Sequence, residues 1–417
     1  MKDTTTMGWA TLYALVACVL ATACGKISDD EESSDDGEMA EETPGFVRPP
    51  DVTGLEACEP GAPVTEPCVD DWGARLCPVD SGWPGDELAL CDSGQEFGLA
   101  YHYGPKNYDD PEEIEKYMLE AGGEDENCVY VRSKNTEPVY AAGYHGRMRP
   151  GSHHLIVTVV PDPPADLILD EPVSCNQTDA VGLRWLIGSQ DPQIDVSAAG
   201  SLQAAPPEPG DPDYGAATLI PANAVLRIDM HYLNPTDEDI LRESWIWMER
   251  VEEEEVEVQI DMITWYQGLI NVPPMSTGTT TPVSRCRVPS DRYLGLVTGH
   301  FHENGTRVTV WHEPQGEETR KVYETFNWED PGNAAFADRI DNPSMDDLAA
   351  GEWGAETGYV HVKQGDVVSF QCEFDNPTDV TVGFGDTGSD QMCNIFGFYY
   401  PTDGDVWNCV CAGPLCL

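Results

Sequence analysis

The sequence predicts an all-β protein made of two antiparallel β-sandwiches. From residue 93 onward, short runs with alternating apolar and polar residues are separated by Gly, Pro, Asn and Asp, the pattern of strands and turns. Helical periodicity is confined to one short stretch. The chain has 417 residues, of which 40% are hydrophobic, enough for two domains of roughly 150 residues each and additional segments.

The first residues indicate export. The apolar run Met7–Val19 is shorter than the roughly 20 residues that cross a bilayer, so residues 1–24 are expected to form a signal peptide. Leu20–Cys24 looks like a bacterial lipobox, in which Cys24 would be lipidated; Leu15–Cys18 is a second candidate, and plain secretion is the alternative. We expect an outer-membrane or cell-surface lipoprotein of a bacterium, or alternatively a periplasmic or secreted protein, with membrane contact only through the lipid.

The remainder divides into four parts. Residues 25–50 are an acidic tract with few apolar residues, which predicts a disordered tether. Residues 51–92 are rich in Cys, Pro and Gly and form a small disulfide-linked segment. Residues 93–260 and 261–417 are the two predicted sandwich domains.

Within these domains one helix is expected at Pro111–Ala121, with Asp110 as its N-cap and Gly122 ending it. The main expected strands are Cys128–Arg132, His154–Val160, Val225–Tyr232, Val251–Ile260, Arg292–Phe301, Thr306–Trp311, Tyr359–Val362 and Val367–Phe374.

Charge and cysteine content exclude some functions. The formal net charge of -53 argues against binding nucleic acid or anionic lipid, because both need basic surface. The chain has 14 cysteines, which in an exported protein predict disulfides. Apart from Cys18 and Cys24 they are even in number: Cys58, Cys68, Cys77, Cys91, Cys128, Cys175, Cys286, Cys372, Cys393, Cys409, Cys411 and Cys416.

Residues 294–311, LGLVTGHFHENGTRVTVW, have the pattern of a β-hairpin. Asn304-Gly305 between two alternating runs is typical of a type I′ turn, which needs positive φ at both positions. Alternation along the first strand would place His300 and His302 on one side. Two imidazoles on one side of a hairpin make half of a metal site.

Other candidate ligands are weaker when taken singly. His231 shares a strand face with Arg227 and Asp229. His153 and His154 are adjacent, so both can bind one metal only if the strand is irregular there. Met392 lies in residues 386–401, DTGSDQMCNIFGFYYP, and a thioether beside imidazoles favours copper(I) over zinc. The other histidines, His102, His145, His312 and His361, are expected to be structural or on the surface.

Four motifs in order, GSHHLIV, DMHYLNP, GHFHENGT and SDQMCNIFGFYYP, resemble the copper type II, ascorbate-dependent monooxygenases, including peptidylglycine alpha-hydroxylating monooxygenase and dopamine beta-hydroxylase. The resemblance covers about Cys91 to the C-terminus. It implies two jelly-roll-like domains, each with one copper ion. It also implies that His153, His154 and His231 hold an electron-donating copper, and that His300, His302 and Met392 hold the copper that binds dioxygen.

The resemblance further implies disulfides Cys128–Cys175 and Cys372–Cys393, and Cys286 paired with Cys411 or Cys409. Asn394 keeps the family's asparagine and is a candidate substrate residue. Thr298 replaces the arginine that helps hold a peptide carboxylate in the best-known family member, and Phe396 replaces a tyrosine. Because a bidentate guanidinium is missing, a peptide substrate is not expected.

The function expected from these features is hydroxylation of a C–H bond of a small molecule, with two coppers, dioxygen and a one-electron reductant such as ascorbate. The alternative is a non-catalytic surface copper-binding or adhesion module with the same fold. A third interpretation is a disulfide-rich β-protein with surface histidines and no copper.

Overall fold

The computed structural model describes residues 75–76, 81–91, 98–175, 183–189, 191–199, 207, 214–328, 331, 333–335, 360–385, 387, 389–402 and 406–416. The chain divides into two units, Met1–Gly54 and Leu55–Leu417, and every element below belongs to the second. The predicted signal peptide, Cys24, the tether, and Cys58, Cys68 and Cys77 lie outside the described residues. None of the helices in the described part of the chain has the length and hydropathy of a membrane span.

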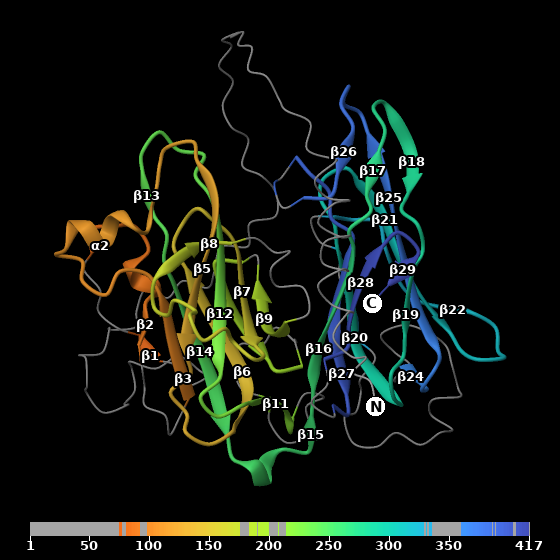
Figure 1. Cartoon of the computed structure of the whole chain (residues 1–417), viewed down its shortest axis with the longest axis horizontal. Coiled ribbons are helices and arrows are strands. Elements are labelled where there is room, and N and C mark those ends of the chain that lie inside the picture. The colour runs from red at the N-terminus through yellow and green to blue at the C-terminus, as the bar shows by residue number, and fades with distance from the viewer. Residues whose placement is uncertain are drawn as a thin grey trace, which may run out of the picture. The chain divides into compact units, whose positions relative to one another are not determined.

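The strands of the first sandwich run from orange to green in Figure 1. One sheet has the order β15 (Val258–Gln259), β11 (Ala216–Ile220), β6 (Val139–Met148), β14 (Ser244–Val251), β3 (Gly98–Tyr103), and β10 (Gln193–Ser197) also pairs with β6. The other has the order β8 (Pro172–Ser174), β5 (Glu124–Arg132), β12 (Val225–Leu233), β7 (Ser152–Val160), β9 (Arg184–Ser189). Two small ribbons pair β1 (Arg75–Leu76) with β2 (Leu90–Cys91), and β4 (Met118–Leu119) with β13 (Ile240–Leu241).

Alternation along the central strand β12 explains the core of this sandwich. Leu226, Ile228, Met230 and Tyr232 are buried in the same hydrophobic core as Ile246 of β14. The other face of β12 carries polar residues that end at His231. The strand therefore packs the domain with one face and supplies a candidate ligand with the other.

The strands of the second sandwich run from green to blue in Figure 1. One sheet has the order β23 (Asn333–Ala335), β20 (Arg292–His300), β27 (Asn394–Tyr400), β16 (Asp261–Gln267), β28 (Asn408–Ala412), β29 (Leu415–Cys416), and β24 (Val360–Val362) also pairs with β20. The other has the order β18 (Ser276–Thr280), β25 (Val367–Asn376), β21 (Gly305–Glu313), β22 (Arg320–Thr325), and β19 (Ser284–Arg287) also pairs with β25. A short ribbon pairs β17 (Asn271–Val272) with β26 (Val382–Gly383).

The prediction of an all-β fold is confirmed, because strands dominate and helices are short in the described part of the chain. The expected helix at Pro111–Ala121 is wrong in its length: α2 spans only Pro111–Glu115, with Asp110 accepting a hydrogen bond from the Glu112 N–H. Met118 and Leu119 instead form β4, which pairs with β13. The expected strand Val251–Ile260 is also wrong, since Glu253–Glu255 form a 3-10 turn (η3) between β14 and β15.

The predicted hairpin at residues 294–311 is wrong. β20 pairs with β27 in one sheet and β21 pairs with β25 in the other, so the chain crosses between sheets here. Neither Asn304 nor Gly305, both described, has a positive φ. The crossing is instead fixed by packing: Phe301 is buried, and a Cβ on Gly305 would lie 1.9 Å from its ring.

Polar and apolar contacts join the two sandwiches. Arg184 of β9 binds Asp261 at the start of β16, with Nε 2.6 Å from Oδ1. Phe398 and Tyr400 of β27 belong to the first sandwich's core, and Trp185 packs with Tyr266 in a smaller apolar cluster. These contacts place the outer face of the β20–β27 pair against the first sandwich.

Candidate metal centres

His153, His154 and His231 form a cluster in the first sandwich. One ring nitrogen from each lies within 4.8 Å of the others. The ring centroids are 4.9 Å apart for His154 and His231, and 5.0 Å apart for His153 and His231. Three nitrogen atoms at this separation can share one metal ion.

A β-bulge explains how two adjacent histidines reach the same point. In the β12–β7 ladder His231 faces His154, but Tyr232 faces Ser152, so His153 is the extra residue. Adjacent residues of a regular strand would point to opposite faces, and a bulge re-aims one side chain. The irregularity that the sequence required for this pair is therefore present.

Glu124 orients one ring of the cluster. The Nε2 atom of His231 lies 2.9 Å from Oε1 of Glu124, on the neighbouring strand β5. Donation from Nε2–H to the carboxylate leaves the lone pair on Nδ1, which is buried and has no hydrogen-bond partner. A buried nitrogen without a hydrogen-bond partner, beside two other imidazoles, has the lone pair and the neighbours that a metal ligand requires.

His300 and His302 are neighbours in the second sandwich, with ring centroids 5.3 Å apart. His300 ends β20, whereas His302 lies in the crossing to β21, so strand alternation is not what brings them together. The Nδ1 atom of His302 lies 2.9 Å from the carbonyl oxygen of Asp390. A carbonyl accepts but does not donate, so Nδ1 carries the proton and Nε2 keeps a lone pair for a metal.

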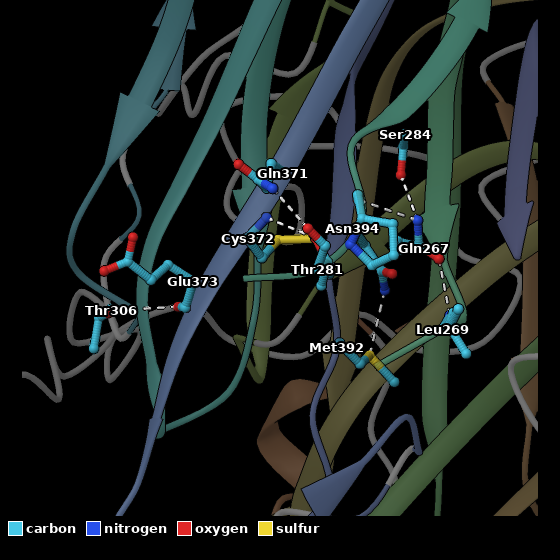
Figure 2. The surroundings of a disulfide bond; sticks show 12 residues. Gln267, Leu269, Thr281, Ser284, Thr306, Gln371, Cys372, Glu373, Met392 and Asn394 are labelled. Atoms are coloured by element: carbon cyan, nitrogen blue, oxygen red, sulfur yellow. Dashed lines mark hydrogen bonds between the residues drawn. A yellow bond between two sulfur atoms is a disulfide. The ribbon is translucent and has the colours of Figure 1, made fainter. Parts of the chain in front are cut away.

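The residues on either side of Met392 contact this histidine pair. The Asp390 carbonyl holds His302, and Asn394 faces His300 in the β20–β27 ladder. Figure 2 shows the Asn394 amide directed at the sulfur of Met392, with Nδ2 3.3 Å from Sδ. Met392 is buried, and the amide that contacts its thioether belongs to Asn394, the residue opposite His300 in the ladder.

Disulfides fix the backbone beside both groups. Cys128 pairs with Cys175, and Cys372 pairs with Cys393, as the family resemblance implies. The second bond follows Met392 directly and is drawn in Figure 2 beside Thr281, whose carbonyl accepts from Gln371. A flexible thioether gains a defined position from such an anchored neighbour.

Of the two partners considered for Cys286, the structure pairs Cys409, so the first choice, Cys411, is wrong. Cys409 and Cys411 lie on the same face of β28, with sulfur atoms 3.7 Å apart, which made them indistinguishable by sequence. Cys411 bonds to Cys416, which faces it across the β28–β29 hairpin.

Electrostatic effects connect the two histidine groups. Burial, together with the charges of His302 and then His153, lowers the pKa of His300 to about 3. Burial, together with the charges of His231 and His302, lowers the pKa of His153 to about 4. Each group thus lies close enough to disfavour protonation of the other, and both have neutral, ligand-competent rings at pH 7.

A cavity of about 330 Å³ is lined by residues of both sandwiches. His154 and His300 both line it, so the two histidine groups border one space. Ile156 and Trp185 contribute from the first sandwich, and Thr298 and Phe396 from the second.

The other four histidines have structural partners. His102 bonds Glu243, His145 bonds Asp195, and His312 bonds Asp366, at 2.6, 2.6 and 2.9 Å. His361 stacks on Tyr293, with centroids 4.7 Å apart. Their assignment to structural roles agrees with these contacts.

Sequence reasoning missed Glu124, the Asp390 carbonyl and Trp185. The polar run Glu124–Asn127 at the start of β5 was a signal for a polar strand end, but only the hydrogen bond in the structure shows that Glu124 reaches His231. No local pattern predicts that a backbone carbonyl will hold His302.

Residues 355–415 match the family model described as copper type II ascorbate-dependent monooxygenase, C-terminal domain. No curated protein matched significantly. Two solved structures that match are those of the Macrobrachium rosenbergii nodavirus, with 11% identity over 79% of this chain and 87% of that chain and a TM-score of 0.14, and infectious bursal disease virus Gx strain, with 7% identity over 75% and 73% and a TM-score of 0.13. Scores this low carry no inference about fold or function.

The donor atoms fit copper, the metal of the matching family. Imidazole nitrogens suit copper, and a thioether among them selects its reduced form. In His231 the nitrogen available to such an ion is Nδ1, which has no hydrogen-bond partner. In His302 it is Nε2, because Nδ1 donates to the Asp390 carbonyl. The family resemblance is confirmed for residues 355–415, which are similar to the C-terminal domain of the copper type II ascorbate-dependent monooxygenases.

Proposed function

We propose that this protein is a copper-dependent monooxygenase that hydroxylates a C–H bond of a small molecule, using dioxygen and a one-electron reductant such as ascorbate. The observation that carries the proposal is that His154 and His300, from two different ligand groups, line one cavity. A substrate in that cavity would lie beside both groups.

His153, His154 and His231 would hold one copper ion, and His300, His302 and Met392 the other. Bound copper would supply one-electron redox chemistry and the capacity to activate dioxygen. The chain's own residues have the tasks of orientation and exclusion of water. Glu124 and the Asp390 carbonyl fix the tautomers of two ligand rings, and Asn394 positions the thioether.

A peptide carboxylate is a poor fit for this site. Thr298 and Phe396 face each other in the β20–β27 ladder, and both line the cavity. The two departures from the best-known family member therefore lie side by side: Thr298 stands where that protein has an arginine, and Phe396 where it has a tyrosine. Without the guanidinium a carboxylate loses its bidentate partner.

The disulfides support the proposal that the protein works outside the cytoplasm. Four are present among the described residues, and such bonds persist in oxidising compartments. We further propose that the N-terminal segment exports the chain and that Cys24 anchors it through lipid.

The test is incorporation of oxygen from labelled dioxygen into product, with copper-loaded protein, ascorbate and a panel of small neutral and charged substrates. We expect a labelled alcohol from the wild type, none from His300→Ala, and an undiminished amount from His361→Ala, a histidine outside the cavity. Tight binding of copper without any labelled product would instead support the copper-binding module. Protein that holds no copper would exclude both.

A further inference from the structure

We infer that the cavity between the two histidine groups selects a neutral, apolar molecule of aromatic or alicyclic character and excludes carboxylates and ammonium ions. The inference rests on the proposed function, since the molecule that the cavity selects would be the substrate of that reaction. It depends, however, on the cavity wall alone, so it can be tested without turnover.

One wall is the outer face of the β20–β27 pair. Three cross-strand pairs follow one another along it: His300 with Asn394, Thr298 with Phe396, and Leu296 with Phe398. Successive pairs on one face of a sheet are about 6.5–7 Å apart. The cross-strand pair next to His300 therefore already contributes the apolar ring of Phe396 to the wall.

The opposite wall comes from β7 and β9. Ile156 follows His154 on the same face of β7, and Trp185 lies beside it. The indole of Trp185 packs on Phe396, with centroids 5.2 Å apart and planes inclined by 34°. The same ring of Phe396 lies 6.2 Å from the ring of His300. Aromatic surface from both sandwiches thus meets directly beside a candidate metal ligand.

The cavity offers no charge to a ligand. Among the lining residues that the structure describes, none is Asp, Glu, Lys or Arg. The nearest guanidinium along the chain, that of Arg184, is already bound to Asp261 and to the carbonyl of Leu219. A charged ligand would lose its hydration without gaining an ionic partner from the wall, which is costly.

The size of the cavity narrows the ligand further. Its volume of about 330 Å³ lies near the lower end of the ~300–1,000 Å³ that small-molecule sites span. A mono- or bicyclic molecule fits this space, whereas a long peptide or a polysaccharide would extend beyond it. Aromatic and branched aliphatic lining favours a ring over a polar chain.

The experiment is isothermal titration calorimetry with three probes of the same shape: 2-(naphthalen-2-yl)ethanol, naphthalen-2-ylacetate and 2-(naphthalen-2-yl)ethylamine. The full-length protein is titrated both metal-free and loaded with copper(I) under anaerobic conditions. Copper content is measured on the same preparations. We expect the alcohol to bind the metal-free protein at least about 10-fold more tightly than either ion.

Two variants link this preference to the cavity. Thr298→Arg places a guanidinium in the wall. This variant is expected to bind the alcohol less tightly and the acetate more tightly than the wild type does, so that the acetate becomes the tighter ligand of the two. Thr277→Arg adds the same charge at an exposed position of β18 outside the cavity and should leave the order unchanged.

Equal or tighter binding of either ion by the metal-free wild type would overturn the inference, as would absence of binding by all three probes. The inference would also be overturned if Thr298→Arg, shown to be folded by circular dichroism, still bound the alcohol more tightly than the acetate. If the alcohol is preferred but the protein holds no copper, the cavity inference stands and the proposed function fails. If copper binds but the protein does not prefer the alcohol, the cavity inference fails and the proposed function is unaffected.

Discussion

Asn394 stands opposite His300 across the β20–β27 ladder and at the same time donates its amide to the sulfur of Met392, at 3.3 Å. One side chain thereby connects the strand that carries the histidine with the residue that would supply the thioether. The position of the thioether at this point depends on a buried amide that would not itself be a ligand.

Asn394→Leu is therefore expected to weaken copper(I) binding at the second group about 10- to 100-fold, the usual effect of losing such a supporting contact. Leucine has the same branched side-chain skeleton as asparagine but cannot donate to Sδ. The affinity is measured by competition with a chromophoric copper(I) chelator. Asn327→Leu, exposed in the same sandwich, is the control. Equal affinities of Asn394→Leu and wild type would show that the amide has no role.

Glu124→Ala is expected to weaken copper binding at the three-histidine group, again about 10- to 100-fold. The carboxylate that accepts from Nε2 of His231 would be lost, and Nδ1 would no longer be held as the lone-pair nitrogen. Glu124→Gln keeps an acceptor oxygen and should lose less. The same chelator competition measures both, with the exposed Glu120→Ala as the matched control. A loss in Glu120→Ala as large as in Glu124→Ala would contradict this role.

Much of the fold could be predicted from the alternation of apolar and polar residues and from composition. The strands β5, β7, β12, β20 and β25 lie where alternation placed them, because one face of each is buried in a sandwich core. The hairpin at residues 294–311 failed because Asn-Gly is a local signal. Burial of Phe301 and the pairing of β21 with β25 are contacts with distant residues, and they decided the path of the chain.

The candidate site shows the same division. The histidines and Met392 could be named from motifs, and the sequence even showed that His153 and His154 needed an irregular strand. The bulge that provides it is set by the register of β12 against β7, which no local pattern reveals. Glu124 was missed for that reason also, since its partner His231 is 107 residues away.

Asp261→Ala is expected to destabilise the protein by about 3–5 kcal/mol, because it leaves the guanidinium of Arg184 buried without its carboxylate. Asp261 also accepts from Thr402, at 2.6 Å, so the loss extends to β27's C-terminal end. Urea denaturation followed by fluorescence measures the change. The exposed Asp237→Ala should alter the midpoint little. A similarly small shift for Asp261→Ala would mean that this ion pair does not hold the sandwiches together.

Acid should destabilise the metal-free protein before its carboxylates titrate. In the unfolded chain His153 and His300 take up protons near pH 6.5, but in the folded protein only near pH 4 and 3. Between these values the unfolded state binds more protons, so the free energy of unfolding falls as the pH falls, by at most about 1.4 kcal/mol per pH unit for each histidine. Urea midpoints at pH 7.5, 6 and 5 measure this slope. His153→Gln should show a shallower slope between pH 6.5 and 5, and an equal slope would refute the assignment.

X-ray absorption of the copper(I)-loaded protein, combined with copper stoichiometry, tests the account most directly. We predict two copper ions per chain in the wild type and a Cu–S scattering shell, because the proposed second group has Met392 as a ligand whereas the proposed first group has histidines alone. Met392→Ile should keep the three-histidine copper and lose the Cu–S shell. A wild type without a Cu–S shell, or a shell that persists in Met392→Ile, would contradict the account.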